Sequence, residues 1–194
     1  TLNIGEEELR RLIELGMSGR LLSRGEPKNM EGNFLAPTEL AQTWLDANLA
    51  EKWQLLLESW TTSTWTNEGR TLAHTNDRLP SFREKVLQVY LRGAKPTFEE
   101  ALRFHFPLFA THTADETIAD LRAEAEWIGA IALDRPTSVL IEGPEAAARL
   151  TPGTVDYFLI QADMTVLVPG PLEPETHQRL ESVADLESPG LASV

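Results

Sequence analysis

The chain has 194 residues, of which 42% are hydrophobic and 24% charged, the composition of an ordinary soluble globular protein with one domain or two small ones. It contains no Cys, which excludes a disulfide framework and a thiolate zinc site and suits a reducing cytoplasm. No apolar run approaches the ~20 residues that a membrane-spanning helix needs, and no signal-peptide pattern opens the chain. We therefore expect a cytoplasmic protein that does not enter a membrane.

The net charge of −13 has the wrong sign for a free-standing DNA-binding protein, but it is distributed unevenly. Residues 1–95 carry 12 Lys and Arg against 13 Asp and Glu, whereas residues 96–194 carry 5 against 17. Any surface that faces phosphates is therefore expected in the first half. The acidic second half should repel nucleic acid and suits a protein partner.

The first part of the chain reads as a helix followed by a hairpin. Residues 6–17 place apolar side chains at helical spacing behind a first turn rich in Glu, and Gly19 follows the helix. Residues 20–24 and 33–36 look like two short strands around a loop that contains Gly and Pro. Because residue 1 is Thr and the hairpin is preceded by a single helix, we expect this chain to be a piece of a longer protein.

Further helices follow, with a polar interval between them. Pro37 is well placed in the first turn of a helix that breaks near Ala47. Residues 61–80 are polar and predict a linker or mobile loop. Capping boxes predict the starts of four helices. Their residues are Asn48 with Glu51, Ser81 with Glu84, Thr97 with Glu100, and Thr113 with Glu116.

After the last of these helices, the chain repeats the order of its first segment. Gly129 precedes a strand-like run at residues 130–133, and a second apolar run follows at residues 138–141. Three helices followed by a hairpin is the winged-helix arrangement, which would be complete over residues 81–143. The sequence thus predicts tandem winged-helix-like units, the first of which shows only its third helix and wing.

The closing region changes architecture. Residues 157–160 and 164–168 are short apolar runs rich in β-branched and aromatic residues, and they predict two strands. An amphipathic helix from Pro174 to about Asp185 needs a sheet to cover. Since two strands alone are marginal, we expect residues 191–194 to form a strand that pairs with one of these two or with another molecule.

Several stretches of the chain resemble a family of actinobacterial helicase-associated proteins that share a domain with the N-terminal region of XPB-type DNA helicases. The most specific lie near the C-terminus, and the family pattern runs on past Val194. The matching pieces are LAPTELAQTWLDANLAEKW at residues 35–53, QADMT at 161–165, VPGPL at 168–172 and ADLES at 184–188. The resemblance implies winged-helix units that lead into a small α/β domain, and it transfers no catalytic residue.

Taken together, pattern and resemblance predict an α+β, mainly helical fold. Its parts are a partial winged-helix unit at residues 1–60, a linker at 61–80, a second unit at 81–150 and the start of an XPB N-terminal-like domain at 151–194. The resemblance implies a non-enzymatic DNA-binding or DNA-repair-associated module of an XPB-like helicase system. The alternative is a scaffold that binds a helicase or another protein and never contacts DNA.

Other chemistry finds little support in the sequence. The chain has no Gly-x-x-x-x-Gly-Lys-Ser/Thr phosphate loop, so it is not the helicase motor. Its His residues (His74, His105, His112 and His177) lack metal-ligand spacing, and we expect no cofactor. Asp163 could be a metal ligand or a general base, but a turn carboxylate that accepts backbone N–H bonds is the favoured interpretation. Core packing is expected for Trp44, Trp53, Trp60 and Trp127, and exposure for Trp65.

One basic cluster accompanies a predicted DNA-reading element. It lies on the first helix and its hairpin, where winged helices usually meet phosphates. Its members are Arg10, Arg11, Arg20, Arg24 and Lys28. Against DNA binding, four Glu share the same helix, and exposed charges are the default for any solvated surface.

Overall fold

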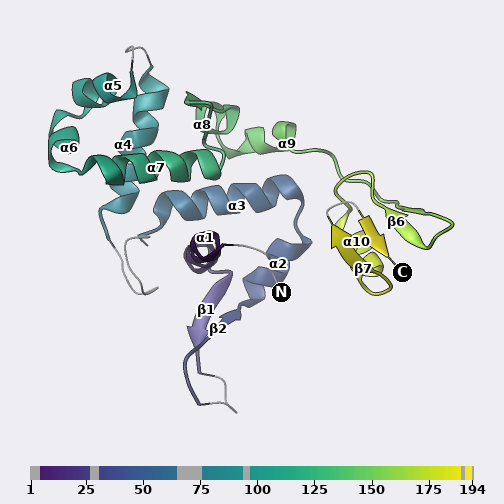
Figure 1. Ribbon diagram of the computed structural model, residues 1–194. Helices are drawn as coiled ribbons and strands as arrows, with labels where there is room; N and C mark the ends of the chain where they lie inside the picture. Colours follow the sequence, from purple (N-terminus) through teal and green to yellow (C-terminus); the bar gives the residue numbers. More distant parts are fainter. Residues whose placement is uncertain (1–4, 27–30, 65–75, 94–96, 189–190, 194) are drawn as a thin grey trace.

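The computed structural model describes residues 5–26, 31–64, 76–93, 97–188 and 191–193, and it is mainly helical with small antiparallel sheets (Figure 1). Within this part of the chain, no helix is both long and apolar enough to span a bilayer. The helices are α1 (Glu6–Ser18), α2 (Glu39–Asp46), α3 (Leu49–Thr62), α4 (Leu79–Arg92), α5 (Phe98–His105), α6 (Pro107–His112), α7 (Asp115–Trp127), α8 (Ser138–Glu142), the 3-10 turn η1 (Pro144–Ala146), α9 (Ala147–Leu150) and α10 (Pro174–Glu181). The strands are β1 (Leu22–Gly25), β2 (Phe34–Pro37), β3 (Ile131–Ala132), β4 (Arg135–Pro136), β5 (Leu159–Ile160), β6 (Thr165–Leu167), β7 (Asp185–Ser188) and β8 (Leu191–Ser193).

Helix α3 lies at the centre of the helical body and contacts α1, α4 and α9. It begins at the predicted capping box, in which Asn48 and Glu51 exchange side-chain and backbone bonds. Its buried face carries Leu57 and Trp60 into a core that also holds Leu15 of α1 and Leu87 of α4.

Trp53 joins α3 to the end of α7. Its indole Nε1 donates to the carbonyl oxygen of Ile128 over 2.7 Å. A Cβ on Gly129 would lie 2.7 Å from this ring, and Gly129 has a φ of +82°, so both space and backbone geometry require glycine here.

A second core fills the space between α4, α5, α6 and α7. Val86 and Val89 of α4 meet Leu121 of α7 there, and the rings of Phe82 and Phe109 pack edge to face with centroids 4.9 Å apart. Two cores hold the helical body together, and they are joined through α4 and α7, which contribute residues to both.

Three of the predicted helix starts are wrong. α2 begins at Glu39 with Thr38 at the N-cap, because Pro37 is used as the last residue of β2. α4 begins two residues before Ser81, where Pro80 suits the first turn, and the Ser81 hydroxyl instead pairs with Lys85. Thr113 ends α6 in an extended conformation, so Ala114 is the N-cap of α7.

The start of α5 and the break after it are confirmed. The Thr97 hydroxyl accepts the backbone N–H of Glu100, as the capping pattern predicts. α5 ends at His105 and Pro107 opens α6, since proline lacks the N–H that would continue the first helix.

Both predicted hairpins exist, but the second uses different residues. β1 and β2 pair antiparallel from Leu22 opposite Pro37 to Gly25 opposite Phe34, close to the predicted runs. β3 pairs with β4 at Arg135–Pro136, so the prediction of a strand at residues 138–141 is wrong because that run forms α8. The chain reverses at Leu133 and Asp134, which both have positive φ as a two-residue hairpin turn demands.

The C-terminal sheet has the strand order β5-β6-β8-β7, with each neighbouring pair antiparallel. The predicted C-terminal strand is confirmed as β8, and of the partners that the sequence left open it pairs with β6, within residues 164–168. α10 covers this sheet, and Val166 and Leu180 are almost fully buried between them. α10 ends at Glu181, so the predicted extension to about Asp185 is wrong, and residues 185–188 form β7 instead.

Candidate functional site

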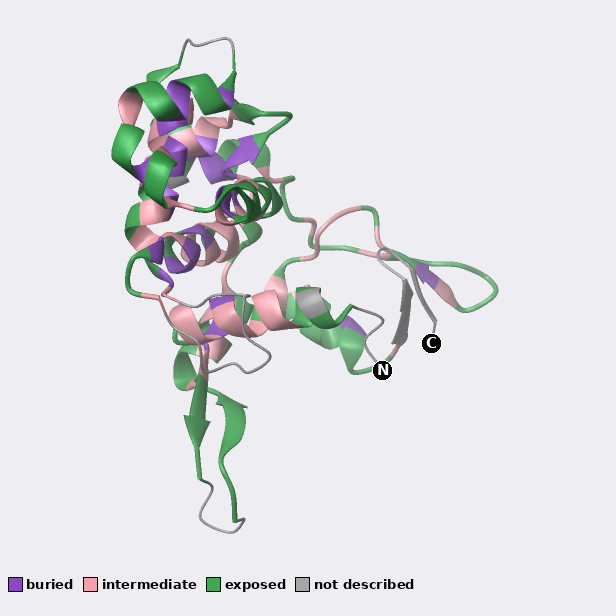
Figure 2. Ribbon diagram, turned by 60° about the vertical axis from the view of Figure 1, so that its left-hand side comes forward, coloured by how far each residue is buried: buried purple, intermediate pink, exposed green. Residues whose placement is uncertain are grey.

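The β1–β2 hairpin extends away from the helical body, and all of its strand residues except Leu22 are exposed (Figures 1 and 2). Even Phe34 and Leu35 keep 39% and 40% of their surface accessible. Apart from Leu22, which lies against α1, the residues of both strands are exposed to solvent.

The base of the hairpin is fixed to the end of α1. Leu21 is buried, its backbone N–H donates to Gly16, and its carbonyl accepts from Thr38 at 2.9 Å. The Thr38 hydroxyl donates to the carbonyl of Arg20 over 2.7 Å. Gly16 leaves room for Leu22, since a Cβ there would lie 2.7 Å from its side chain. Both strands are therefore tied to one helix end, while the rest of the ribbon extends beyond it.

The structure divides the predicted basic cluster. Arg24 is exposed on β1, and Arg20 is exposed in the turn between α1 and β1. Arg10 pairs with Glu6 one turn away on α1, and the guanidinium of Arg11 lies 6.0 Å from the centre of the Trp127 ring. Lys28 lies outside the described residues. The hairpin and the turn before it thus present two of the five predicted contact residues, and α1 holds two in contacts within the protein.

A buried ion pair that sequence reasoning missed lies beside α1. Arg83 of α4 is only 3% exposed and lies 3.1 Å from the carboxylate of Glu124 on α7. The same carboxylate accepts the indole N–H of Trp60 at 2.9 Å, and Arg83 also donates to the carbonyl of Ser63. Helical spacing carried a signal for this pair. Arg83 precedes buried Val86 and Leu87 by three and four residues, and Glu124 stands in the same relation to Leu121 and Ile128 on either side.

Glu14 of α1 belongs to this charge cluster. Burial, and then the negative charge of Glu124, raise the pKa of Glu14 to about 7, although Arg83, Arg11 and Arg10 oppose the shift. The seat of α1 on the helical body therefore contains a carboxyl group that changes its charge near neutral pH.

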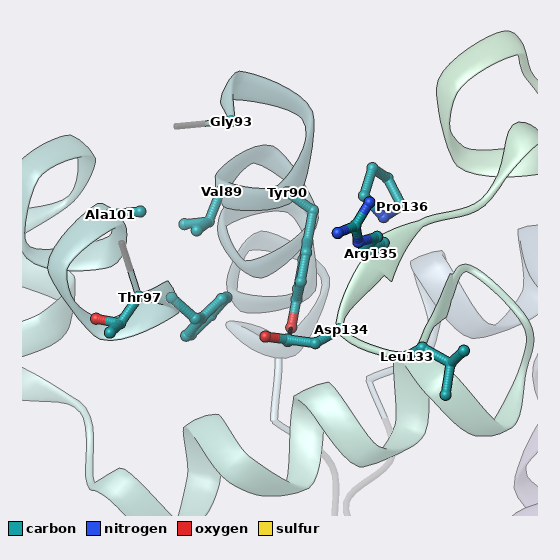
Figure 3. A pocket seen from close by; sticks show the side chains of 10 residues that line it. Val89, Tyr90, Gly93, Thr97, Ala101, Leu133, Asp134, Arg135 and Pro136 are labelled. Atoms are coloured by element: carbon teal, nitrogen blue, oxygen red, sulfur yellow. Dashed lines mark hydrogen bonds between the residues drawn. The ribbon is translucent and has the colours of Figure 1, made fainter. Parts of the chain in front are cut away.

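The second hairpin borders a pocket of about 500 Å³ between α4 and the start of α5 (Figure 3). Its lining mixes apolar side chains with a few polar ones, and these residues come from the ends of α4 and α5 and from the β3–β4 hairpin. They are Val89, Tyr90, Gly93, Thr97, Phe98, Ala101, Leu133, Asp134, Arg135 and Pro136.

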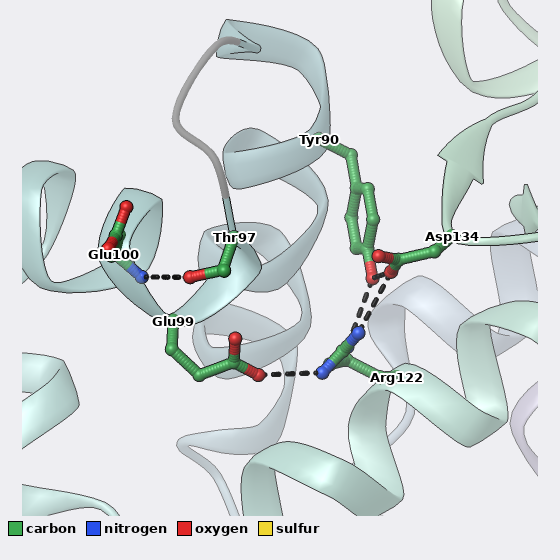
Figure 4. A network of polar contacts seen from close by, with 6 residues as sticks. All are labelled: Tyr90, Thr97, Glu99, Glu100, Arg122 and Asp134. Carbon is green, nitrogen blue, oxygen red and sulfur yellow. Dashed lines mark hydrogen bonds and ion pairs between the residues drawn. The ribbon is translucent and has the colours of Figure 1, made fainter.

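A polar network forms one side of this pocket (Figure 4). Arg122 of α7 donates to the Tyr90 hydroxyl oxygen at 3.0 Å, to Asp134 at 2.8 Å and to Glu99 at 3.1 Å. The Tyr90 hydroxyl in turn donates to Asp134 over 2.7 Å, and the guanidinium of Arg122 stacks 4.3 Å from the centre of the Phe98 ring. These contacts tie the tip of the β3–β4 hairpin to three helices.

The contacts within this network shift the pKa values of Tyr90 and Asp134 in opposite directions. Burial, together with the bond to Asp134, raises the pKa of Tyr90 to about 12, so the phenol stays protonated at neutral pH. The hydrogen bond from Tyr90, aided by Arg122, holds the pKa of Asp134 below its usual value. The Asp134 carboxylate is therefore a weaker proton acceptor than an ordinary aspartate.

The structure also locates the residues that the sequence offered as metal ligands or turn residues. Among the described residues, no group of three or more His, Asp or Glu could hold a metal ion. His74 lies outside this set. Asp163 accepts both the backbone N–H and the hydroxyl of Thr165, which lowers its pKa and makes it a turn carboxylate, the favoured interpretation.

The described Trp residues differ in how far they are buried. Trp60 is buried at 3% exposure, and Trp44 and Trp53 are half-buried. The prediction that Trp127 packs in the core is wrong, because its side chain lies on the surface at the end of α7 with Arg11 beside it. Trp65 lies outside the described residues.

Comparison with known proteins adds no relative: no family model, no curated protein and no solved structure matches the chain.

Proposed function

We propose that the chain is a non-enzymatic, DNA-binding or DNA-repair-associated module of an XPB-like helicase system, and that its β1–β2 hairpin contacts DNA. The observation that carries the proposal is the exposed ribbon, with Arg24 on β1 and Arg20 in the turn that precedes this strand. The sequence resemblance to helicase-associated proteins supports the same function, and a cytoplasmic setting belongs to the same proposal.

The dimensions of a two-stranded ribbon support this role. The major groove of B-DNA admits either a helix or a two-stranded β-ribbon, and Arg side chains beside such an element neutralise phosphates. α1, the end of which holds the ribbon, would act as the third helix of a winged-helix unit, and the ribbon as its wing. Arg10, Arg11 and Lys28 complete the proposed contact set, and the exposed pair of Arg10 with Glu6 is weak enough to exchange for a phosphate.

Titration of labelled duplex and single-stranded DNA, followed by fluorescence anisotropy at low and moderate salt, tests the proposal. Binding should weaken as salt rises and should be lost in the double variant Arg20→Glu with Arg24→Glu. The matched control is Arg149→Glu with Arg179→Glu, which makes the same change in net charge at exposed positions far along the chain. Equal loss in both double variants would contradict the hairpin as the contact site.

The second candidate is a protein-interaction scaffold that binds a helicase or another protein without DNA. The observation that favours it is the charge of residues 96–194, with 5 Lys and Arg against 17 Asp and Glu. If no DNA binds even at low salt, the DNA proposal fails and the scaffold remains.

A further inference from the structure

The C-terminal sheet has a free edge at β5. Among the residues that the structure describes, β5 pairs with β6 alone and is the outermost strand of the sheet. The backbone N–H of Gln161 donates to Thr165 at 2.8 Å, so the alternation of an antiparallel pair turns the backbone groups of Ile160 and Phe158 away from β6. In both views the β5–β6 hairpin extends away from the helices (Figures 1 and 2).

Apolar side chains lie along this edge. Leu159 and Leu167 face each other across the strands on the side opposite α10, and they are 51% and 40% exposed. Ile160 shares the α10 side with buried Val166, yet it is 63% exposed because nothing in the described chain lies beyond it. An unpaired edge with apolar side chains on both faces is a template for another strand.

Carboxylates bracket the edge at both ends. Asp156 precedes β5, Asp163 follows it, and both are exposed. Residues 151–194 carry 7 Asp and Glu against a single Arg, Arg179, which already pairs with Glu175. The two bonds from Thr165 lower the pKa of Asp163 and so favour its ionised form, and the residue is exposed.

This charge pattern excludes a second copy of the chain as a good occupant. In the antiparallel register that pairs Ile160 of one copy with Phe158 of the other, Asp156 of each copy lies opposite residue 162 of the other, next to Asp163. Like charges at both ends of such a ladder are unfavourable. The complementary strand is apolar at its centre and basic at its ends.

We propose that the free edge of β5 accepts a strand from a partner protein, and that this strand carries Lys or Arg on either side of an apolar centre. The mode is β-augmentation, in which backbone bonds supply affinity and the flanking charges supply selectivity. The proposal goes beyond the DNA contact at β1–β2 and does not depend on it.

A labelled peptide of alternating valine and threonine flanked by lysines provides the probe, and the same peptide flanked by glutamates provides its control. Fluorescence anisotropy should detect binding of the lysine peptide, with the glutamate peptide at least about tenfold weaker. Asp156→Asn with Asp163→Asn should weaken the lysine peptide about fivefold and flatten its salt dependence. The side-chain amide introduced by Asp163→Asn keeps an oxygen that can accept the bonds from Thr165.

Two substitutions at Ile160 distinguish the contribution of its backbone N–H to peptide binding from that of its side chain. Ile160→Pro removes an N–H that points away from β6, a position where edge strands tolerate proline, and should weaken the peptide about tenfold more than Ile160→Ala does. The amide chemical shifts of Gln161 and Leu167 report whether the β5–β6 pair survives in each variant.

Equal binding of both peptides, equal binding by the Pro and Ala variants with β5–β6 intact, or no binding of the lysine peptide at low salt would each overturn the proposal. Reversible dimerisation in sedimentation velocity that Ile160→Pro abolishes would also overturn it, because self-pairing would then occupy the edge. The variant Arg20→Glu with Arg24→Glu should bind the lysine peptide as the unaltered chain does, which keeps this test separate from the DNA test.

Discussion

The two hairpins of the helical body each follow the end of a helix, but one is attached to the body at its base and the other at its tip. β1–β2 follows the end of α1 and β3–β4 follows the end of α7, each after a glycine. Within the described residues, β1–β2 is attached at its base, through Leu21 and Thr38, and its strands beyond Leu22 are exposed. β3–β4 is two residues long on each side, and its tip is anchored by Asp134.

The difference lies in what surrounds each hairpin rather than in the hairpins themselves. Helices α4, α5 and α7 surround β3–β4, and Arg122 connects Asp134 to Tyr90 and Glu99 (Figure 4). β1–β2 has no comparable neighbours in the described chain. A short anchored hairpin suits stability and a longer exposed one suits binding, which is why we propose β1–β2 as the DNA contact.

The strongest test of this comparison makes the same substitution near each hairpin. Arg122→Met removes three hydrogen-bonding partnerships and leaves Asp134 without its cation, and we expect a loss of about 2–3 kcal/mol in the free energy of unfolding. Arg24→Met on exposed β1 should change it by less than about 0.5 kcal/mol. Urea denaturation measures both, and equal losses would mean that β1–β2 is anchored too.

Local sequence signals located the first hairpin well and the second only in part. The runs at residues 20–24 and 33–36 are bounded by Gly, so the strands fell within two residues of the prediction. Residues 138–141 form a short apolar run, which periodicity cannot assign to strand or helix. The Thr137 hydroxyl donates to the carbonyls of Gly129 and Ala130, which ends the ladder and lets a helix begin.

Long-range contacts were beyond local reasoning for a physical reason. Tyr90, Arg122 and Asp134 come from separate elements, and no periodicity links them. Arg83 and Glu124 were within reach, because each occupies an inward position of its helix between apolar residues. The residues of β5 were predicted to form a strand, but only the order of strands in the sheet identifies β5 as an edge strand.

A second, smaller effect concerns the helix that holds β1–β2. The pKa of Glu14 is about 7 in the folded chain against an ordinary 4.5, so its carboxyl group binds a proton more tightly when α1 is seated. The stability that the fold gains from protonated Glu14 is present in full below pH 4.5, and it is lost as the pH rises through about 7. Glu14→Gln should therefore raise the free energy of unfolding by roughly 1–2 kcal/mol at pH 8, a figure reduced for solvent screening because Glu14 is only partly buried.

The control for this pH effect is Glu8→Gln, which neutralises an exposed carboxylate on the same helix. Urea denaturation at pH 4, 6 and 8 should show the gain of Glu14→Gln growing with pH, while Glu8→Gln stays nearly level. A gain of equal size at all three values would point to packing rather than to charge. Faster amide exchange in α1 and β1 at pH 8, suppressed by Glu14→Gln, would identify α1 as the element that loosens.

The smallest effect distinguishes backbone strain from charge at the base of β1–β2. Arg20 and Leu133 both have positive φ, at 58° and 50°, and both side chains are exposed. Relief of this strain by glycine is offset in part by the entropy of the unfolded chain, so Arg20→Gly and Leu133→Gly should each add about 0.5 kcal/mol to the free energy of unfolding. Arg24→Gly, in an extended strand, should instead cost about 0.5–1 kcal/mol. If DNA binds β1–β2, both Arg variants weaken it although their stabilities move in opposite directions, whereas a loss of binding that follows stability alone would remove Arg20 and Arg24 from the contact.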